Sequence, residues 1–141
     1  MEQNQELLTE VYENALIGKE TLGRLIKRSK DANFRNVMAD QFAEYHNVLT
    51  DAEQLGQQFS IPLRPARAPK APIHASMCLN LAVDQTSSHM AEMILQGSML
   101  GIIDLTRALR ACPDAAEEIR ALADRLLKTE ENHTRQMYEN L

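Results

Sequence analysis

The sequence predicts an all-α fold, a single four-helix bundle that spans residues 1–141. Apolar residues recur at alternating spacings of three and four along most of the chain, and this period places them on one face of a helix. Glycine and proline number only 5 each, so the elements between turns must be long. A chain of 141 residues can bury a sufficient core without a disulfide or a structural metal.

The first two helices are predicted over residues 4–29 and from Asp31 to Phe59, with Asp31 as the N-terminal cap of the second. The inward stripe of the first helix is Leu8, Tyr12, Ala15, Lys19, Leu22, Ile26 and Ser29. The second helix has an unbroken stripe that repeats with heptad spacing: Phe34, Met38, Gln41, Tyr45, Val48, Ala52, Leu55 and Phe59.

Residues 60–72, SIPLRPARAPKAP, hold four of the five prolines and cannot form a helix. In an extended conformation of about 3.1 Å per residue, this segment reaches about 40 Å, the length of a helix of roughly 26 residues. The Pro-rich segment is therefore long enough to cross the whole bundle.

The third helix is predicted from about Ile73 to Ala111, with a kink near Ser87 and Ser88. From Met90 to Ile103 its apolar residues surround the helix rather than occupy one stripe, so we expect cover from two sides. Gly97 and Gly101, four residues apart, expose backbone on one side of the helix and permit close approach by a neighbour.

Pro113 is predicted to open the fourth helix, because its missing N–H is harmless in the first turn. Acidic residues follow it, where the positive end of the helix dipole favours them. The helix should continue to about Asn140. Its inward stripe is Ala115, Ile119, Leu122, Leu126, Glu130, His133, Met137 and Leu141.

Four helices thus form two hairpins, joined by one long Pro-rich connection between the second and third helices. A crossing connection makes these two helices parallel, which is the arrangement of ferritin-like bundles. The alternative is an up-down-up-down bundle in which the Pro-rich segment is a bulged turn.

The segments SSHMAEMILQGSMLGIIDLTRAL, from Ser87, and ELLTEVYENALIGKETL, from Glu6, resemble a family of small uncharacterised bacterial proteins of ferritin-like type. The resemblance extends over nearly the whole chain, and HMAEMILQGSMLGI is its most specific part. It implies the fold and supplies no activity. Histidines do not belong to that family's pattern, so a site built on His133 would be either particular to this chain or accidental.

The chain has a net charge of -5, and its basic residues form no stripe that would favour nucleic acid as a partner. No run of about 18 apolar residues suggests a membrane span, and the first residues, MEQNQELLTE, are unlike a secretory signal. We therefore expect a cytoplasmic protein. Cys78 and Cys112 have no zinc-binding spacing, and we expect both to stay reduced, because a continuous helix between them would hold them about 50 Å apart.

One pattern points to metal. Di-iron and di-manganese carboxylate bundles use a Glu from each of two helices and a Glu-x-x-His pair from each of the other two. Glu130 and His133 form such a pair on the inward stripe of the fourth helix, but Ala43 stands where a Glu should precede His46.

Matching levels along the helices gathers a layer of polar residues within about one helical turn of that pair. Its members are Glu20, Gln41, Glu44, Glu92, Gln96, Glu130 and His133. If the layer binds iron or manganese, the candidate ligands are Glu20, Glu44, Glu92, Glu130 and His133. The simpler interpretation is a hydrogen-bonded layer in which Glu20, Glu44 and Glu92 turn to solvent, Tyr45 finds a partner for its hydroxyl, and no cofactor is bound.

No arrangement of a nucleophile and a base is evident, because Ser87, Ser88 and His89 are adjacent in a helix and do not face one another. The leading hypothesis is a non-enzymatic bundle that acts through self-association, most simply as a homodimer, or through a protein partner. The alternative hypothesis is a metal-binding protein of the di-iron or di-manganese type.

Overall fold

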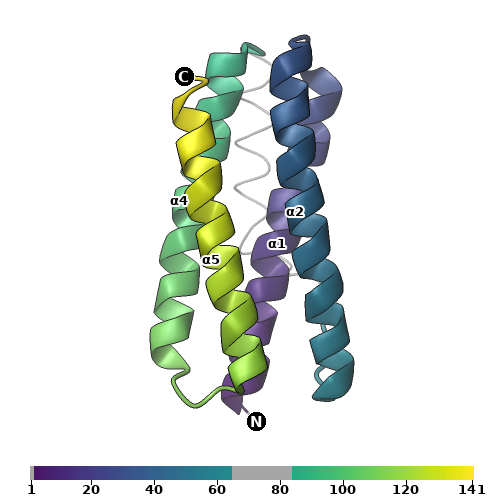
Figure 1. The fold of residues 1–141 in the computed structure, drawn as a ribbon, viewed down its shortest axis with the longest axis vertical. Coiled ribbons are helices and arrows are strands. Elements are labelled where there is room, and N and C mark those ends of the chain that lie inside the picture. Colours follow the sequence, from purple (N-terminus) through teal and green to yellow (C-terminus); the bar gives the residue numbers. More distant parts are fainter. Residues whose placement is uncertain (1, 65–83) are drawn as a thin grey trace.

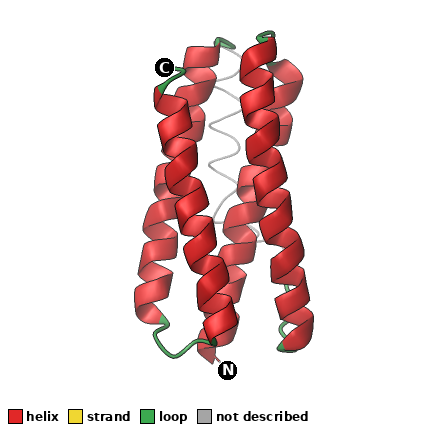
Figure 2. Ribbon diagram, viewed as in Figure 1, coloured by secondary structure: helices red, strands yellow, loops and turns green. Residues whose placement is uncertain are grey.

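A computed structural model describes residues 2–64 and 84–141 (Figure 1). Four long helices account for most of them: α1 (Glu2–Arg28), α2 (Ala32–Gln58), α4 (Ser87–Ala111) and α5 (Glu117–Tyr138). The described residues contain no strand (Figure 2). The predicted all-α bundle is thereby confirmed at this level.

The α2 helix matches its predicted stripe. Its first six members, from Phe34 to Ala52, are buried, and Leu55 and Phe59 are half-buried against the core. Asp31 caps the helix as expected, because its Oδ1 accepts a hydrogen bond from the backbone N–H of Phe34 at 3.2 Å. After the helix, Ser60 adopts a left-handed backbone conformation with φ 56°.

The α1 stripe is wider than predicted. Tyr12, Lys19 and Ile26 are only half-buried, whereas Leu7, Val11, Asn14 and Leu25 join the buried set. The physical reason is that α1 packs against three helices, namely its hairpin partner α2, its neighbour α4 and the diagonally placed α5. One narrow stripe cannot serve three contacts.

The starts of α4 and α5 differ from the prediction. Residues 84–86 are not helical, and α4 begins at Ser87 with Thr86 as its cap, whose Oγ1 accepts from the N–H of His89 at 3.2 Å. A continuous helix from Ile73 is therefore wrong, and residues 73–83 lie outside the described part. Pro113 does not open α5 either, because residues 112–116 form a turn and the helix begins at Glu117.

Helix directions follow from Figure 1, in which α1 rises from the N-terminus, α2 and α4 descend, and α5 rises to the C-terminus. Two hydrogen bonds agree: Ser87 Oγ donates to Asp31 Oδ2 at 3.0 Å, joining the starts of α2 and α4, and the Ala116 N–H donates to Asn4 Oδ1 at 2.6 Å, joining the starts of α1 and α5. The two hairpins thus place α2 and α4 parallel. This rules out the up-down-up-down alternative; most of the Pro-rich connection, residues 65–72, lies outside the described residues.

The core lies between the four helices and is apolar at both ends, with Leu25 and Phe34 near one end and Leu7 and Ile119 near the other. Cys112 is buried there as a free thiol, while Cys78 lies outside the described residues. No helix in the described part of the chain is long and apolar enough to cross a membrane.

Candidate functional site

Buried polar side chains gather at the middle of the bundle and come from all four helices. We call them the polar layer; its members are Asn14, Gln41, Tyr45, Ser98, Glu130 and His133. A layer of this kind is costly unless its groups find partners. Its contacts therefore decide what the centre of the bundle can do.

Glu130 is the central group of the polar layer, with only 2% of its surface exposed. The Tyr45 hydroxyl donates a hydrogen bond to Glu130 Oε1, and the Ser98 hydroxyl also hydrogen-bonds the carboxylate. Burial raises the pKa of Glu130 to about 7, although both hydrogen bonds act to lower it. Near neutral pH this carboxyl group is therefore poised between its charged and neutral forms.

His133 is fully buried one turn further along α5. Its Nε2 lies 3.1 Å from Glu44 Oε2, and its ring meets the Tyr45 ring edge to face, with centroids 4.9 Å apart and an interplanar angle of 78°. Burial lowers the pKa of His133, opposed by the nearby Glu44 carboxylate. His133 is thus held neutral and fixes the Tyr45 ring from one side.

Gln41 extends the polar layer toward α5, where its Nε2 donates to Gln136 Oε1 at 2.7 Å. Two buried atoms, Gln41 Oε1 and His133 Nδ1, have no hydrogen-bond partner among the described residues. The layer is therefore well connected around Glu130 and only partly satisfied on the α2–α5 side.

Two glycines leave room for the side chains of the polar layer to pack against the helix backbone. A Cβ on Gly101 would lie 2.8 Å from Asn14 Oδ1 and 2.9 Å from Glu130 Oε2, and Asn14 Nδ2 donates to the Gly101 carbonyl at 3.2 Å. A Cβ on Gly18 would overlap the Tyr45 ring. The close approach expected of Gly101 is confirmed, whereas a Cβ on Gly97 would meet nothing within 4 Å among the described residues.

The five candidate metal ligands do not converge. Glu130 and His133 point inward as predicted, and Glu44 is exposed but bends its carboxylate to His133. Glu20 and Glu92 are exposed, and Glu92 lies 3.5 Å from His89 instead. Within the described ranges, no three His, Cys, Asp or Glu side chains are grouped so that they could hold a metal ion.

Sequence reasoning placed Tyr45 in the polar layer and missed Asn14 and Ser98. A signal for Asn14 was present, because Leu7, Val11, Asn14, Gly18, Leu22 and Leu25 follow one another at spacings of three and four. Ser98 had no such signal, since it is a small residue within an apolar run.

A cavity of about 50 Å³ adjoins the polar layer between α1 and α4. Its floor includes Tyr45, Ser98 and Glu130, and Gly97 lies at its exposed margin. Since one water molecule needs about 10–15 Å³ of cavity volume, the cavity has room for a few water molecules or one small ligand.

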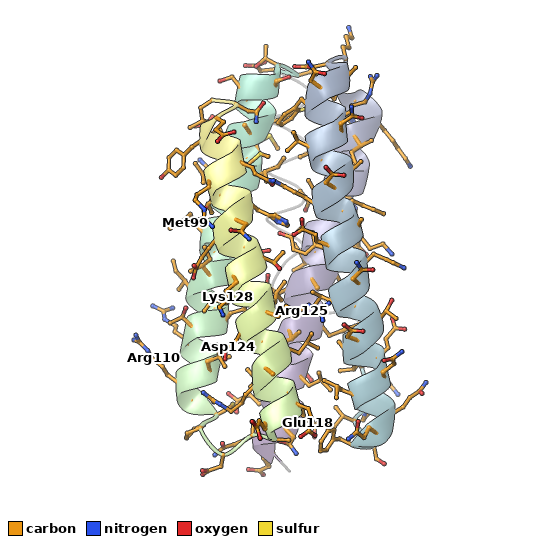
Figure 3. All side chains as sticks on the ribbon, in the orientation of Figure 1. Met99, Arg110, Glu118, Asp124, Arg125 and Lys128 are labelled. Carbon is orange, nitrogen blue, oxygen red and sulfur yellow. The ribbon has the colours of Figure 1, made fainter. Side chains whose placement is uncertain are left out.

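A second feature lies on the opposite, outer side of α4. Met99, Leu100 and Ile103 are 45%, 48% and 41% exposed, and spacings of three and four join them into one patch. Figure 3 shows Met99 and Arg110 on the same outer side of the bundle. We call Met99, Leu100 and Ile103 the outer patch.

Comparison of the chain with protein-family models, with curated proteins and with solved structures gives no match.

Proposed function

We propose that this protein is a ferritin-like helical bundle that acts through self-association, as a homodimer joined by the outer patch of α4. The observation that carries the proposal is the exposure of three adjacent large apolar side chains on one helix. Scattered exposed apolar residues are normal on protein surfaces, but a contiguous group is typical of an interaction site. The parallel course of α2 and α4 supports the ferritin-like part of the proposal.

The outer patch is complementary to itself. If two α4 helices cross antiparallel about a two-fold axis beside position 101, Met99 of one copy lies opposite Ile103 of the other. The same axis places Glu92 opposite Arg110, because both pairs of residue numbers average 101. Glu92, Met99, Ile103 and Arg110 all lie within about 40° of one another around the helix, at 100° per residue, so they belong to one face.

This symmetry supports a second copy of the chain, rather than a different protein, as the partner that covers the outer patch. A two-fold interface is isologous, so one self-complementary surface makes every contact twice. Two Glu92–Arg110 pairs would flank the apolar centre, and exposed ion pairs of this kind set register more than affinity. An unrelated partner would not require the charges to be symmetric about the apolar patch.

Charge reversal tests the proposal. Light scattering at about 10 to 100 µM, the range in which a modest interface is populated, should give twice the chain mass for the natural protein. Ile103→Lys should give the monomer mass. Glu92→Arg and Arg110→Glu should each weaken the dimer, and the double exchange should restore it.

Asp40→Arg is the matched control, because Asp40 is an exposed acid on α2 that the proposed interface does not include. It should leave the dimer intact. A monomeric natural protein at the highest concentration, or a double exchange as weak as the single variants, would refute the proposal.

The metal-binding alternative rests on one observation, the contact between His133 and Glu44 beside Glu130. Metal analysis of protein produced with added iron and manganese, together with oxygen uptake on the same sample, tests it. If the natural protein contained stoichiometric metal and the double variant Glu130→Ala with His133→Ala contained none, this alternative would be favoured over self-association alone.

A further inference from the structure

The cavity beside the polar layer has a polar floor and apolar walls. The polar groups come from Asn14, Thr21, Tyr45, Ser98 and Glu130, and the apolar surface comes from Ile17, Leu22, Met93 and Ile94. This combination of an apolar enclosure and a few convergent polar groups is typical of small-ligand sites.

The charge at the floor is unbalanced. Glu130 receives hydrogen bonds from Tyr45 and Ser98, which are neutral donors. None of the groups that shift its pKa is a cation, and burial keeps the neighbouring His133 neutral. A cation that reaches this buried carboxyl group would favour its charged form.

The size of the cavity limits the ligand. At about 50 Å³ and about 10–15 Å³ for each water-sized group, the space admits a ligand of roughly four non-hydrogen atoms. Gly97 leaves the entrance open, because a side chain there would project into unoccupied space.

We propose that this cavity binds a short primary alkylammonium ion, with its ammonium group on Glu130 and its alkyl chain between Ile17, Leu22, Met93 and Ile94. The ammonium donates to the carboxylate in a charge-assisted hydrogen bond. Asn14 also lines the cavity, and its Oδ1, an acceptor, lies beside Gly101 next to Glu130 Oε2. The alkyl chain covers the apolar walls of the cavity. The inference is independent of the proposed dimer.

Binding should depend on pH, because only the ionised carboxylate attracts the cation. With the pKa of Glu130 at about 7, the ionised fraction rises about tenfold from pH 6 to pH 8, and the affinity rises with it. The other titratable groups in the layer or in contact with it are Tyr45 and Glu44 on α2 and His133 on α5, while α1 and α4 contribute the neutral Asn14 and Ser98. Tyr45, with a pKa raised well above its usual value, stays protonated throughout this range.

The probe is propylammonium, titrated by calorimetry and by amide chemical shifts into the full chain at pH 8, with 1-propanol as the uncharged analogue of equal size. We expect saturable binding with Kd of about 1 mM, which suits a ligand of this size, and at least tenfold weaker binding of 1-propanol. At pH 6 the propylammonium affinity should fall about tenfold.

Two variants isolate the site. Glu130→Gln keeps the shape and removes the charge, and Gly97→Leu keeps the charge and fills the entrance; each should weaken binding at least tenfold. Gly23→Ala is the control, because its Cβ would make an ordinary 3.5 Å contact with Phe42 away from the cavity, and it should bind normally. Circular dichroism verifies that each variant is folded.

Three outcomes would overturn the inference: no saturation up to about 50 mM, equal binding of 1-propanol, or an affinity that neither Glu130→Gln nor Gly97→Leu changes. The monomeric Ile103→Lys variant should bind propylammonium as the natural protein does. The ligand site and the dimer can therefore fail separately.

Discussion

Around residues 98–103, the inner and outer sides of α4 reverse the usual distribution of polar and apolar side chains. Over the same two turns, the inner side presents Ser98 and Gly101 to a buried carboxylate, and the outer side leaves Met99, Leu100 and Ile103 about half exposed. The inner side is small and polar because it must fit around Asn14 and Glu130. The outer side is large and apolar although no helix of the described residues covers it.

This difference leads us to expect that packing within one chain determines the inner side and that association determines the outer side. Changes on the inner side should alter the stability of the single chain, and changes on the outer side should alter association while leaving the single chain stable. Substitutions on each side separate these effects, and all unfolding measurements use the Ile103→Lys background so that only the monomer is observed.

The largest expected effect is the pH dependence that Glu130 imposes. Its pKa is raised from 4.5 to about 7, so between these values the folded chain holds a proton that the unfolded chain has released. The contribution of Glu130 to the free energy of unfolding is therefore fully present below about pH 4.5 and is lost as the pH rises through 7. At pH 8 the folded protein should be about 3 kcal/mol less stable than below pH 4.5. Urea unfolding from pH 5 to pH 8 measures this decline.

Glu130→Gln should abolish that decline. His133 acts in the opposite sense, because its pKa is lowered from 6.5; its contribution is present above that value and is lost as the pH falls. The variant should therefore keep or gain stability between pH 5 and pH 8. If the free energy of unfolding depended on pH equally with Glu130 and with Gln at this position, the pKa of Glu130 would not be raised in the folded protein.

Tyr45→Phe should have the next largest effect. It removes the hydroxyl that donates to Glu130, and leaving a buried ionised acceptor with one partner fewer costs about 2 kcal/mol at pH 8. At pH 5 the cost should shrink, because the carboxyl group is then neutral. Tyr138→Phe is the control, since Tyr138 is 63% exposed and its hydroxyl should not matter at either pH.

The two glycines of α4 should respond in opposite directions to alanine. At Gly101 the new Cβ would lie under 3 Å from Asn14 and Glu130, so we expect a net loss of about 1 to 2 kcal/mol in the free energy of unfolding. At Gly97 the Cβ enters open space, and better helix propensity should add about 0.5 to 1 kcal/mol. Thermal unfolding of both variants would measure the contrast, and a loss at both positions would contradict it.

The smallest expected effect is on the outer patch. Met99→Ala should change the free energy of unfolding of the monomer by less than about 0.5 kcal/mol. Met90→Ala on the same helix should lose about 3 kcal/mol, because Met90 is fully buried. A large loss at Met99 would mean that the outer side also supports the single chain.

The spacing of apolar residues by itself predicted several helices and the residues that they bury. The heptad spacing from Phe34 to Phe59 predicted the extent and the buried face of α2, and the stripe of the last helix correctly placed Glu130 and His133 inward. Both inferences succeeded because the period of a helix links position in the chain directly to direction in space. Tyr45 in the polar layer followed from the same rule.

Tertiary contacts decided the remaining features. Helix α5 starts after Pro113 because Asn4 and Gln3 of α1 accept the N–H groups of Ala116 and Asp114, and local propensity carries no sign of partners so distant in the chain. Glu44 sits on an exposed face yet reaches His133, because a long side chain bends toward a buried partner, whereas Glu20 and Glu92 stay in solvent. Period shows which way a Cβ points; only packing shows what the end of the side chain meets.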